Sequence, residues 1–189
     1  MGDDMGYSLE QYCEDCRAAL AADGGAAGRE AVRANLERLL QDGDFLAAHL
    51  GPDQAVGTRT LYQDPDHEFC VLAYVTDEAR TSMPHDHGAS WAIYGQATGQ
   101  TDITEYRRND GGAGAGAAQL EQTEAYRLEP GKAGLYDVGD IHAIDYPGGA
   151  RFVRVTGTDL NLVPRLRFDP ARGVAETIEN ASVPDPDGN

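Results

Sequence analysis

The first fifty residues carry apolar side chains at the three- and four-residue spacing of amphipathic helices. Ser8 stands where a helix N-cap is expected, and Gly24 interrupts the first stripe of apolar positions. Asp44 is expected to cap a short third helix, which ends before Pro52. The pattern therefore predicts three helices, over residues 8–22, 28–41 and 44–50.

After Gly57 the pattern changes to short runs rich in β-branched and aromatic residues, separated by Gly, Pro, Asp and Asn. Many short strands at even spacing favour a sandwich or barrel. The predicted strands cover residues 58–62, 69–75, 90–94, 102–107, 125–128, 134–138, 143–146, 152–156 and 165–168.

The chain of 189 residues is long enough to bury a core, and we expect one structural domain. Its predicted parts are an N-terminal helical layer over residues 1–52, a β-barrel over 53–174 and a mobile tail over 175–189. The glycine-rich stretch 109–118 lacks the Gly-Lys-Ser/Thr of a phosphate loop, so we interpret it as a hairpin excursion.

The formal net charge of −17 disfavours nucleic acid and membrane surfaces as partners. Three cysteines, an odd number without a signal peptide, favour a reducing, cytoplasmic location. Cys13 and Cys16 fall in a helical pattern and supply only half of a tetrahedral metal site. We expect a monomer or a homodimer.

The spacing of three histidines suggests a metal site. His85 and His87 are separated by one residue, and a strand points such residues to the same face. His142, in Gly-Asp-Ile-His, can supply a third imidazole from a neighbouring strand. The three histidines are therefore a candidate facial ligand set for a divalent metal. Asp86 points to the opposite face, where we expect structural hydrogen bonds.

These segments match the two motifs of the cupin superfamily of double-stranded β-helix (jelly-roll) barrels. In the first, the His-x-His pair is followed after twelve residues by Gly99. In the second, Gly131 and Gly139 precede His142 at the cupin spacing, with Asp137 replacing the usual proline. The chain thus resembles a cupin, which implies a mostly β barrel, here with a small N-terminal helical layer.

Within the cupins, the chain resembles the thiol dioxygenases (the cysteine and 3-mercaptopropionate dioxygenase family). Trp91 and Ala92 occupy the positions where many cupins have a glutamate ligand, which leaves three neutral histidines, as in that family. Arg59 precedes His85 by twenty-six residues, in the register of the arginine that holds the substrate carboxylate. The resemblance implies a mononuclear Fe(II) cofactor, and as partners dioxygen and a small carboxylated thiol.

The sequence departs from that family on a late strand. Arg154, Thr156 and Thr158 replace a Ser-x-His-x-Tyr run whose tyrosine reaches the metal pocket. Arg154 is interpreted either as paired with a buried carboxylate such as Asp145 or as a second anion anchor. With Arg59, a second anchor would favour a thiol with two acidic groups over cysteine. Trp91 and Tyr94 are expected to pack the barrel.

The resulting prediction is a metal-binding oxidoreductase: a non-haem Fe(II) dioxygenase that converts a thiol to a sulfinate. His85, His87 and His142 would bind the metal, and Arg59 and Arg154 the substrate. The alternatives are a three-histidine cupin acting on a non-thiol organic acid, as a carbon–carbon-cleaving dioxygenase or an isomerase, and a non-enzymatic ligand-sensing cupin. The sequence leaves the choice of iron, zinc, nickel or manganese open.

Overall fold

The computed structural model describes residues 6–179, which begin with three helices. The Ser8 hydroxyl accepts a hydrogen bond from the Gln11 backbone amide, and the Gln11 side chain accepts one from Ser8. Asp42, rather than the expected Asp44, caps the third helix by accepting a hydrogen bond from the Phe45 amide at 2.7 Å. The helices are α1 (Leu9–Ala22), α2 (Ala26–Leu39) and α3 (Gly43–Leu50).

All nine predicted strands are present, and the structure adds three short ones. The strands are β1 (Gly57–Gln63), β2 (Cys70–Val75), β3 (Arg80–Thr81), β4 (Ala92–Thr98), β5 (Thr101–Arg108), β6 (Gly116–Ala117), β7 (Leu120–Leu128), β8 (Ala133–Tyr136), β9 (Ile141–Tyr146), β10 (Arg151–Thr156), β11 (Arg165–Asp169) and β12 (Val174–Ile178), with a 3₁₀ turn at Leu160–Leu162. The expected mostly β fold with a small helical layer is confirmed.

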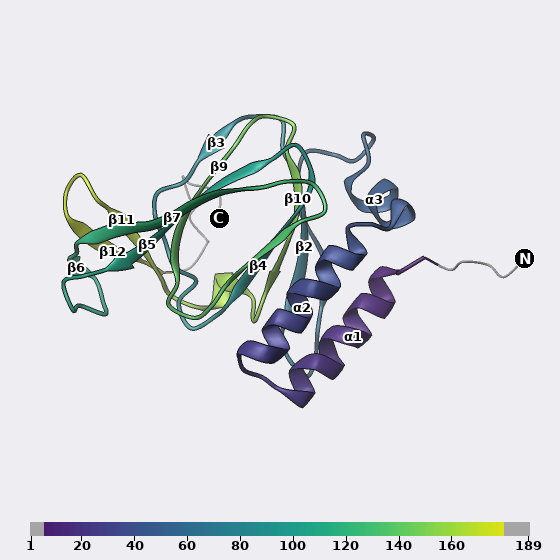
Figure 1. The fold of residues 1–189 in the computed structure, drawn as a ribbon, viewed down its shortest axis with the longest axis horizontal. Coiled ribbons are helices and arrows are strands. Elements are labelled where there is room, and N and C mark those ends of the chain that lie inside the picture. Colours follow the sequence, from purple (N-terminus) through teal and green to yellow (C-terminus); the bar gives the residue numbers. More distant parts are fainter. Residues whose placement is uncertain (1–5, 180–189) are drawn as a thin grey trace, which may run out of the picture.

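The strands form two facing layers. One is a five-stranded sheet in the order β1-β2-β10-β4-β8. The other combines the sheet β3-β9-β5-β7 with the smaller sheet β11-β12-β6. Every pairing between these strands is antiparallel. The helices lie on the outer face of the five-stranded sheet, and the other strands enclose its inner face (Figure 1).

Alternate residues of the five-stranded sheet enter two different cores because successive side chains point to opposite faces. Val71, Ala73 and Val153 face the helices, whereas Tyr74 and Phe152 face the barrel interior. A Cβ atom on Gly95 of β4 would lie 2.7 Å from atoms of Leu36 and Leu40. Glycine at this position therefore lets α2 approach the sheet closely.

The predicted tail begins inside a strand. Val174–Ile178 forms β12, which pairs with β11 and β6, so residues 175–178 belong to the fold. Ala175 is buried beside Phe168 in a third small core, while Glu176 faces Arg167 across the pair at 3.4 Å. The polar outward-facing residues conceal the strand pattern in the sequence. The rest of the expected tail, residues 180–189, lies outside the described residues.

Candidate metal centre

The first two histidines lie in a segment that pairs with strands on both sides. The His85 amide donates to the His142 carbonyl at 2.9 Å, and the His142 amide donates to the His85 carbonyl at 3.0 Å. On the other side, the Asp86 amide donates to the Leu166 carbonyl at 3.0 Å. These bonds hold the segment extended, so His85 and His87 share a face as the spacing predicts.

The residues beside the histidines fix the local backbone. One Asp86 carboxylate oxygen accepts hydrogen bonds from the Gly88 and Leu166 amides, both at 2.9 Å. This confirms the expected structural role of Asp86. Gly88 has φ +62°, and a Cβ there would collide with the Pro164 carbonyl. Only glycine combines this turn with such close contact directly after the second histidine.

The structure brings His85, His87 and His142 together in the barrel interior. One nitrogen from each ring lies within 4.8 Å of the others. The ring centroids are 4.8 to 5.5 Å apart, and the planes cross at 70° to 89°. His87 and His142 have no exposed surface, and His85 is 5% exposed. Within residues 6–179 no carboxylate joins this group of potential ligand atoms.

The protonation of the histidines suits a metal. Burial, followed by the neighbouring His142 and His85, lowers the pKa of His87 well below its usual value. Burial, then His85 and Arg154, does the same to the pKa of His142. The His87 and His142 rings are therefore neutral near pH 7, and their lone pairs are available.

The ring nitrogens of the histidines are also suited to binding a metal. His85 Nδ1 lies 2.9 Å from the Met83 carbonyl, which can only accept, so Nδ1 carries the proton and Nε2 the lone pair. Among residues 6–179, His87 Nδ1 and both ring nitrogens of His142 have no hydrogen-bond partner. Buried polar atoms without partners are costly, and a bound cation would remove part of that cost. The donor set therefore fits a divalent metal with three imidazole ligands.

Tyrosines surround the histidines. The Tyr94 hydroxyl of β4 lies 3.4 Å from His87 Nε2, and the Tyr136 ring centroid lies 3.9 Å from that of His142. The Tyr136 hydroxyl is hydrogen-bonded to Tyr126, which donates to Glu105 at 2.9 Å. The sequence analysis favoured barrel packing for Tyr94 over a place in the pocket wall. Tyr94 lies two residues after Ala92 on β4, so the two side chains share one face, and both belong to the core of the barrel interior.

Arg154 also faces the barrel interior. It lies opposite Leu72 and Tyr94 on the neighbouring strands, and it is 6% exposed. Its guanidinium lies within hydrogen-bonding reach of Tyr94 and 5.1 Å from the Tyr74 ring centroid. Arg154 lines a cavity of about 70 Å³ with a polar wall, formed by Thr60, Gln63, Cys70, Leu72, Thr156, Asp159, Leu160 and Asn161.

A second buried arginine was not foreseen. Arg165 of β11 is 3% exposed, and its charge, like that of Arg154, helps to lower the pKa of His87 after the larger effects of burial and the other histidines. Nothing in the sequence distinguishes Arg165 from Arg167, which lies two residues further along the same strand.

The structure does not bring Arg59 to the histidines. Arg59 pairs with Ala73, whose side chain belongs to the core beneath the helices, so Arg59 lies on the outer face of the sheet. Its guanidinium donates to the His49 carbonyl at 2.6 Å and to Gln54 at 2.5 Å. A cation at the end of α3 is favourable because helix C-termini present unpaired carbonyl groups. The expected carboxylate anchor, and the expected pair of Arg59 with Arg154, are not formed.

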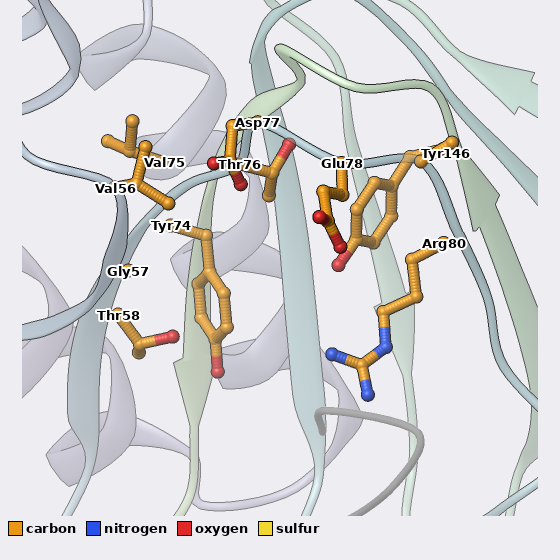
Figure 2. A pocket seen from close by; sticks show the side chains of 11 residues that line it. Val56, Gly57, Thr58, Tyr74, Val75, Thr76, Asp77, Glu78, Arg80 and Tyr146 are labelled. Carbon is orange, nitrogen blue, oxygen red and sulfur yellow. The ribbon is translucent and has the colours of Figure 1, made fainter.

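A cavity of about 460 Å³ lies apart from the histidine group. Thr58, Tyr74, Arg80 and Tyr146 are among the side chains that line it (Figure 2). The Tyr74 ring stacks on Phe152 at 4.7 Å, and Tyr146 lies 5.4 Å from Phe152. None of the three histidines lines this cavity. The Tyr74 ring also lies under the Arg154 guanidinium.

Three solved structures illustrate what the chain is similar to. KdgF from Halomonas sp. is 16% identical, with a TM-score of 0.40 over 55% of this chain and 83% of that chain. The Schizosaccharomyces pombe Cnp3 cupin domain is 11% identical, with a TM-score of 0.43 over 57% and 66%. An uncharacterised Klebsiella pneumoniae protein with a double-stranded β-helix domain is 14% identical, with a TM-score of 0.38 over 59% and 80%. No protein-family model and no curated protein matches the chain.

Proposed function

We propose that this protein is a mononuclear Fe(II) oxidoreductase that adds dioxygen to the sulfur of a small carboxylated thiol. The observation that carries the proposal is the group of three buried histidines, with no carboxylate among its potential ligands in residues 6–179. A divalent cation held by neutral ligands keeps its full charge, which favours an anionic substrate atom such as a thiolate. Iron suits imidazole ligands and supports oxygen chemistry.

The reaction balances without a further reductant. A thiol and dioxygen give a sulfinic acid: both oxygen atoms form bonds to sulfur, the S–H and O–O bonds break, and the proton goes to solvent or to the product. Sulfur loses four electrons and dioxygen takes them up. Bound Fe(II) would supply the redox chemistry that lets these two reactants combine.

The chain's own residues would bind and orient the substrate. Arg154 lies opposite Tyr94 in the barrel interior, and its charge acts on His87 and His142, so its guanidinium suits the carboxylate end of a thiol acid. Tyr94, Tyr136 and Phe152 exclude water from the interior because their rings fill it. This assigns to Arg154 the role that the sequence analysis gave to Arg59.

The partners in this proposal are a small thiol acid and dioxygen. Location in the cytoplasm, a monomeric or homodimeric state, and the absence of nucleic-acid and membrane partners stay predictions. In the part of the chain between residues 6 and 179, no helix combines the length and apolar character needed to cross a bilayer.

Metal analysis and oxygen uptake test the proposal. Protein purified without added metal is first analysed for bound metals, then reconstituted with Fe(II) without oxygen, with Zn(II)-loaded protein as the matched control. We expect oxygen uptake and sulfinate in equal amounts from at least one thiol acid, only in the iron form. No oxygen uptake across a panel of thiol acids would refute the thiol assignment. Uptake with a non-thiol acid would favour the carbon–carbon-cleaving alternative.

A further inference from the structure

Tyr94 places a hydroxyl group beside the histidines from a strand that carries none of them. It lies on β4, is 3% exposed, and its oxygen is 3.4 Å from His87 Nε2. Its ring centroid lies 5.5 Å from that of His142. A distance of 3.4 Å is long for a hydrogen bond, so the contact with His87 holds the hydroxyl only weakly.

Arg154 fixes which way this hydroxyl can donate. The two residues are directly opposite on β10 and β4, which places the guanidinium within hydrogen-bonding reach of the Tyr94 oxygen. Arginine has five donors and no acceptor, so the phenol oxygen is the acceptor in a bond between them. The phenol proton then points to a different acceptor. A guanidinium on the oxygen also strengthens the phenol as a donor, because hydrogen bonds in a chain polarise one another.

We propose that Tyr94 and Arg154 form a donor pair that binds an anionic ligand at the three-histidine centre, with the Tyr94 hydroxyl donating to that ligand. With the histidines committed to a metal, an anionic ligand beside them would be the acceptor for the phenol proton. The pair thereby selects small anions over neutral molecules. This inference rests on the metal site of the proposed function, but not on the identity of the substrate.

Azide binding to the cobalt-loaded protein tests the pair. Visible absorption of Co(II) reports the arrival of an anion at the metal, without any turnover. We expect Tyr94→Phe to weaken azide binding about tenfold, the effect of one hydrogen bond to a charged group. The matched control is Tyr136→Phe, which also removes a buried hydroxyl near His142, but one that is bonded to Tyr126. Its azide affinity should stay within about twofold of the native value.

A double-mutant cycle measures how strongly Tyr94 and Arg154 are coupled in azide binding. Arg154→Met alone should also weaken azide binding, and the double variant should lose less than the sum of the two single losses, because the residues act as one unit. Cobalt content and melting temperature are measured for each variant, so that loss of metal or of folding is seen separately.

Several results would overturn the pair. Unchanged azide affinity in fully loaded Tyr94→Phe would do so, and so would equal losses in Tyr94→Phe and Tyr136→Phe, which would indicate altered packing. A change in cobalt affinity alone would show that the hydroxyl serves His87 instead. If native protein takes up no cobalt, the metal site and the proposed function fail together. If azide binding behaves as expected but no thiol is oxidised, only the thiol assignment fails.

Discussion

Replacing Arg154 by methionine should separate recognition of the substrate carboxylate from the reaction at sulfur. Methionine keeps much of the aliphatic volume that packs beside Tyr74 and Leu72 but removes the guanidinium. Arg59→Met is the matched control. It removes the same group from the other face of the sheet, where it bonds the His49 carbonyl and Gln54.

The expected magnitude follows from the interaction that is lost. A hydrogen bond to a charged group contributes roughly 1.5–3 kcal/mol, so a carboxylated thiol should lose about 10- to 150-fold in kcat/KM in Arg154→Met. A thiol of similar length without the carboxylate makes no such contact, and its kcat/KM should change by less than about threefold. In Arg59→Met both substrates should behave as in the native protein, while stability falls by about 1 kcal/mol.

The assay compares 3-mercaptopropionate with propanethiol as a matched pair of substrates. Oxygen uptake and sulfinate formation are measured for the iron-loaded native protein and both variants, after iron content and melting temperature have been checked. Equal losses for the two thiols in Arg154→Met would refute carboxylate recognition by Arg154. A selective loss for the acid in Arg59→Met would refute the placement of Arg59 outside the barrel.

Three further predictions concern the metal and the fold. His142→Ala should lose stoichiometric metal binding while the far-ultraviolet circular dichroism stays native; a fully metallated variant would contradict the three-histidine site. Asp64→Asn should destabilise the protein by about 2 kcal/mol at pH 7, because the Asp64 carboxylate accepts hydrogen bonds from the His67 and Asp66 amides and from Tyr62. Burial alone would raise the pKa of Asp64, but these hydrogen bonds lower it from 3.8, so the stabilisation exists above that pH and disappears as the pH falls further. Denaturant titrations should therefore show that the stability difference between variant and native protein shrinks in acid. A difference that is independent of pH would exclude the hydrogen-bonded carboxylate as its origin. Gly95→Val should cost about 1–3 kcal/mol in the same titrations, because its side chain would overlap Leu36 and Leu40; an unchanged midpoint would show that α2 can move away.

The helices, the nine main strands and the histidine group could be predicted because they depend on local spacing. A helix stripe and a strand alternation are properties of neighbouring residues, and His85 and His87 share a face whenever their segment is extended. The short strands β3, β6 and β12 were missed since two of them contain only two residues each. The third, β12, shows no clear alternation of apolar and polar residues because two polar residues, Glu176 and Thr177, follow each other in it.

The position of Arg59 could not be predicted from spacing. Which face a strand residue occupies depends on the pairing register, and a shift of one residue moves every side chain to the other face. The pairing of β1 with β2 contains such a shift between Thr60 and Tyr62. Counting residues from Arg59 to His85 therefore says nothing about whether Arg59 enters the barrel. Arg154 could be placed more safely because β10 pairs regularly with β2 from Arg151 to Thr156.

The charge of the interior is opposite in sign to that of the whole chain. The chain carries −17 overall, yet two buried arginines, Arg154 and Arg165, influence the histidines. Surface charges are screened over roughly 8 Å at physiological ionic strength, whereas buried charges are screened much less. The surface therefore gives an anion no long-range attraction, and selection among anions has to come from short-range contacts inside the barrel. Arg154 and Tyr94 are where those contacts are available, because both face the interior beside His87 and His142.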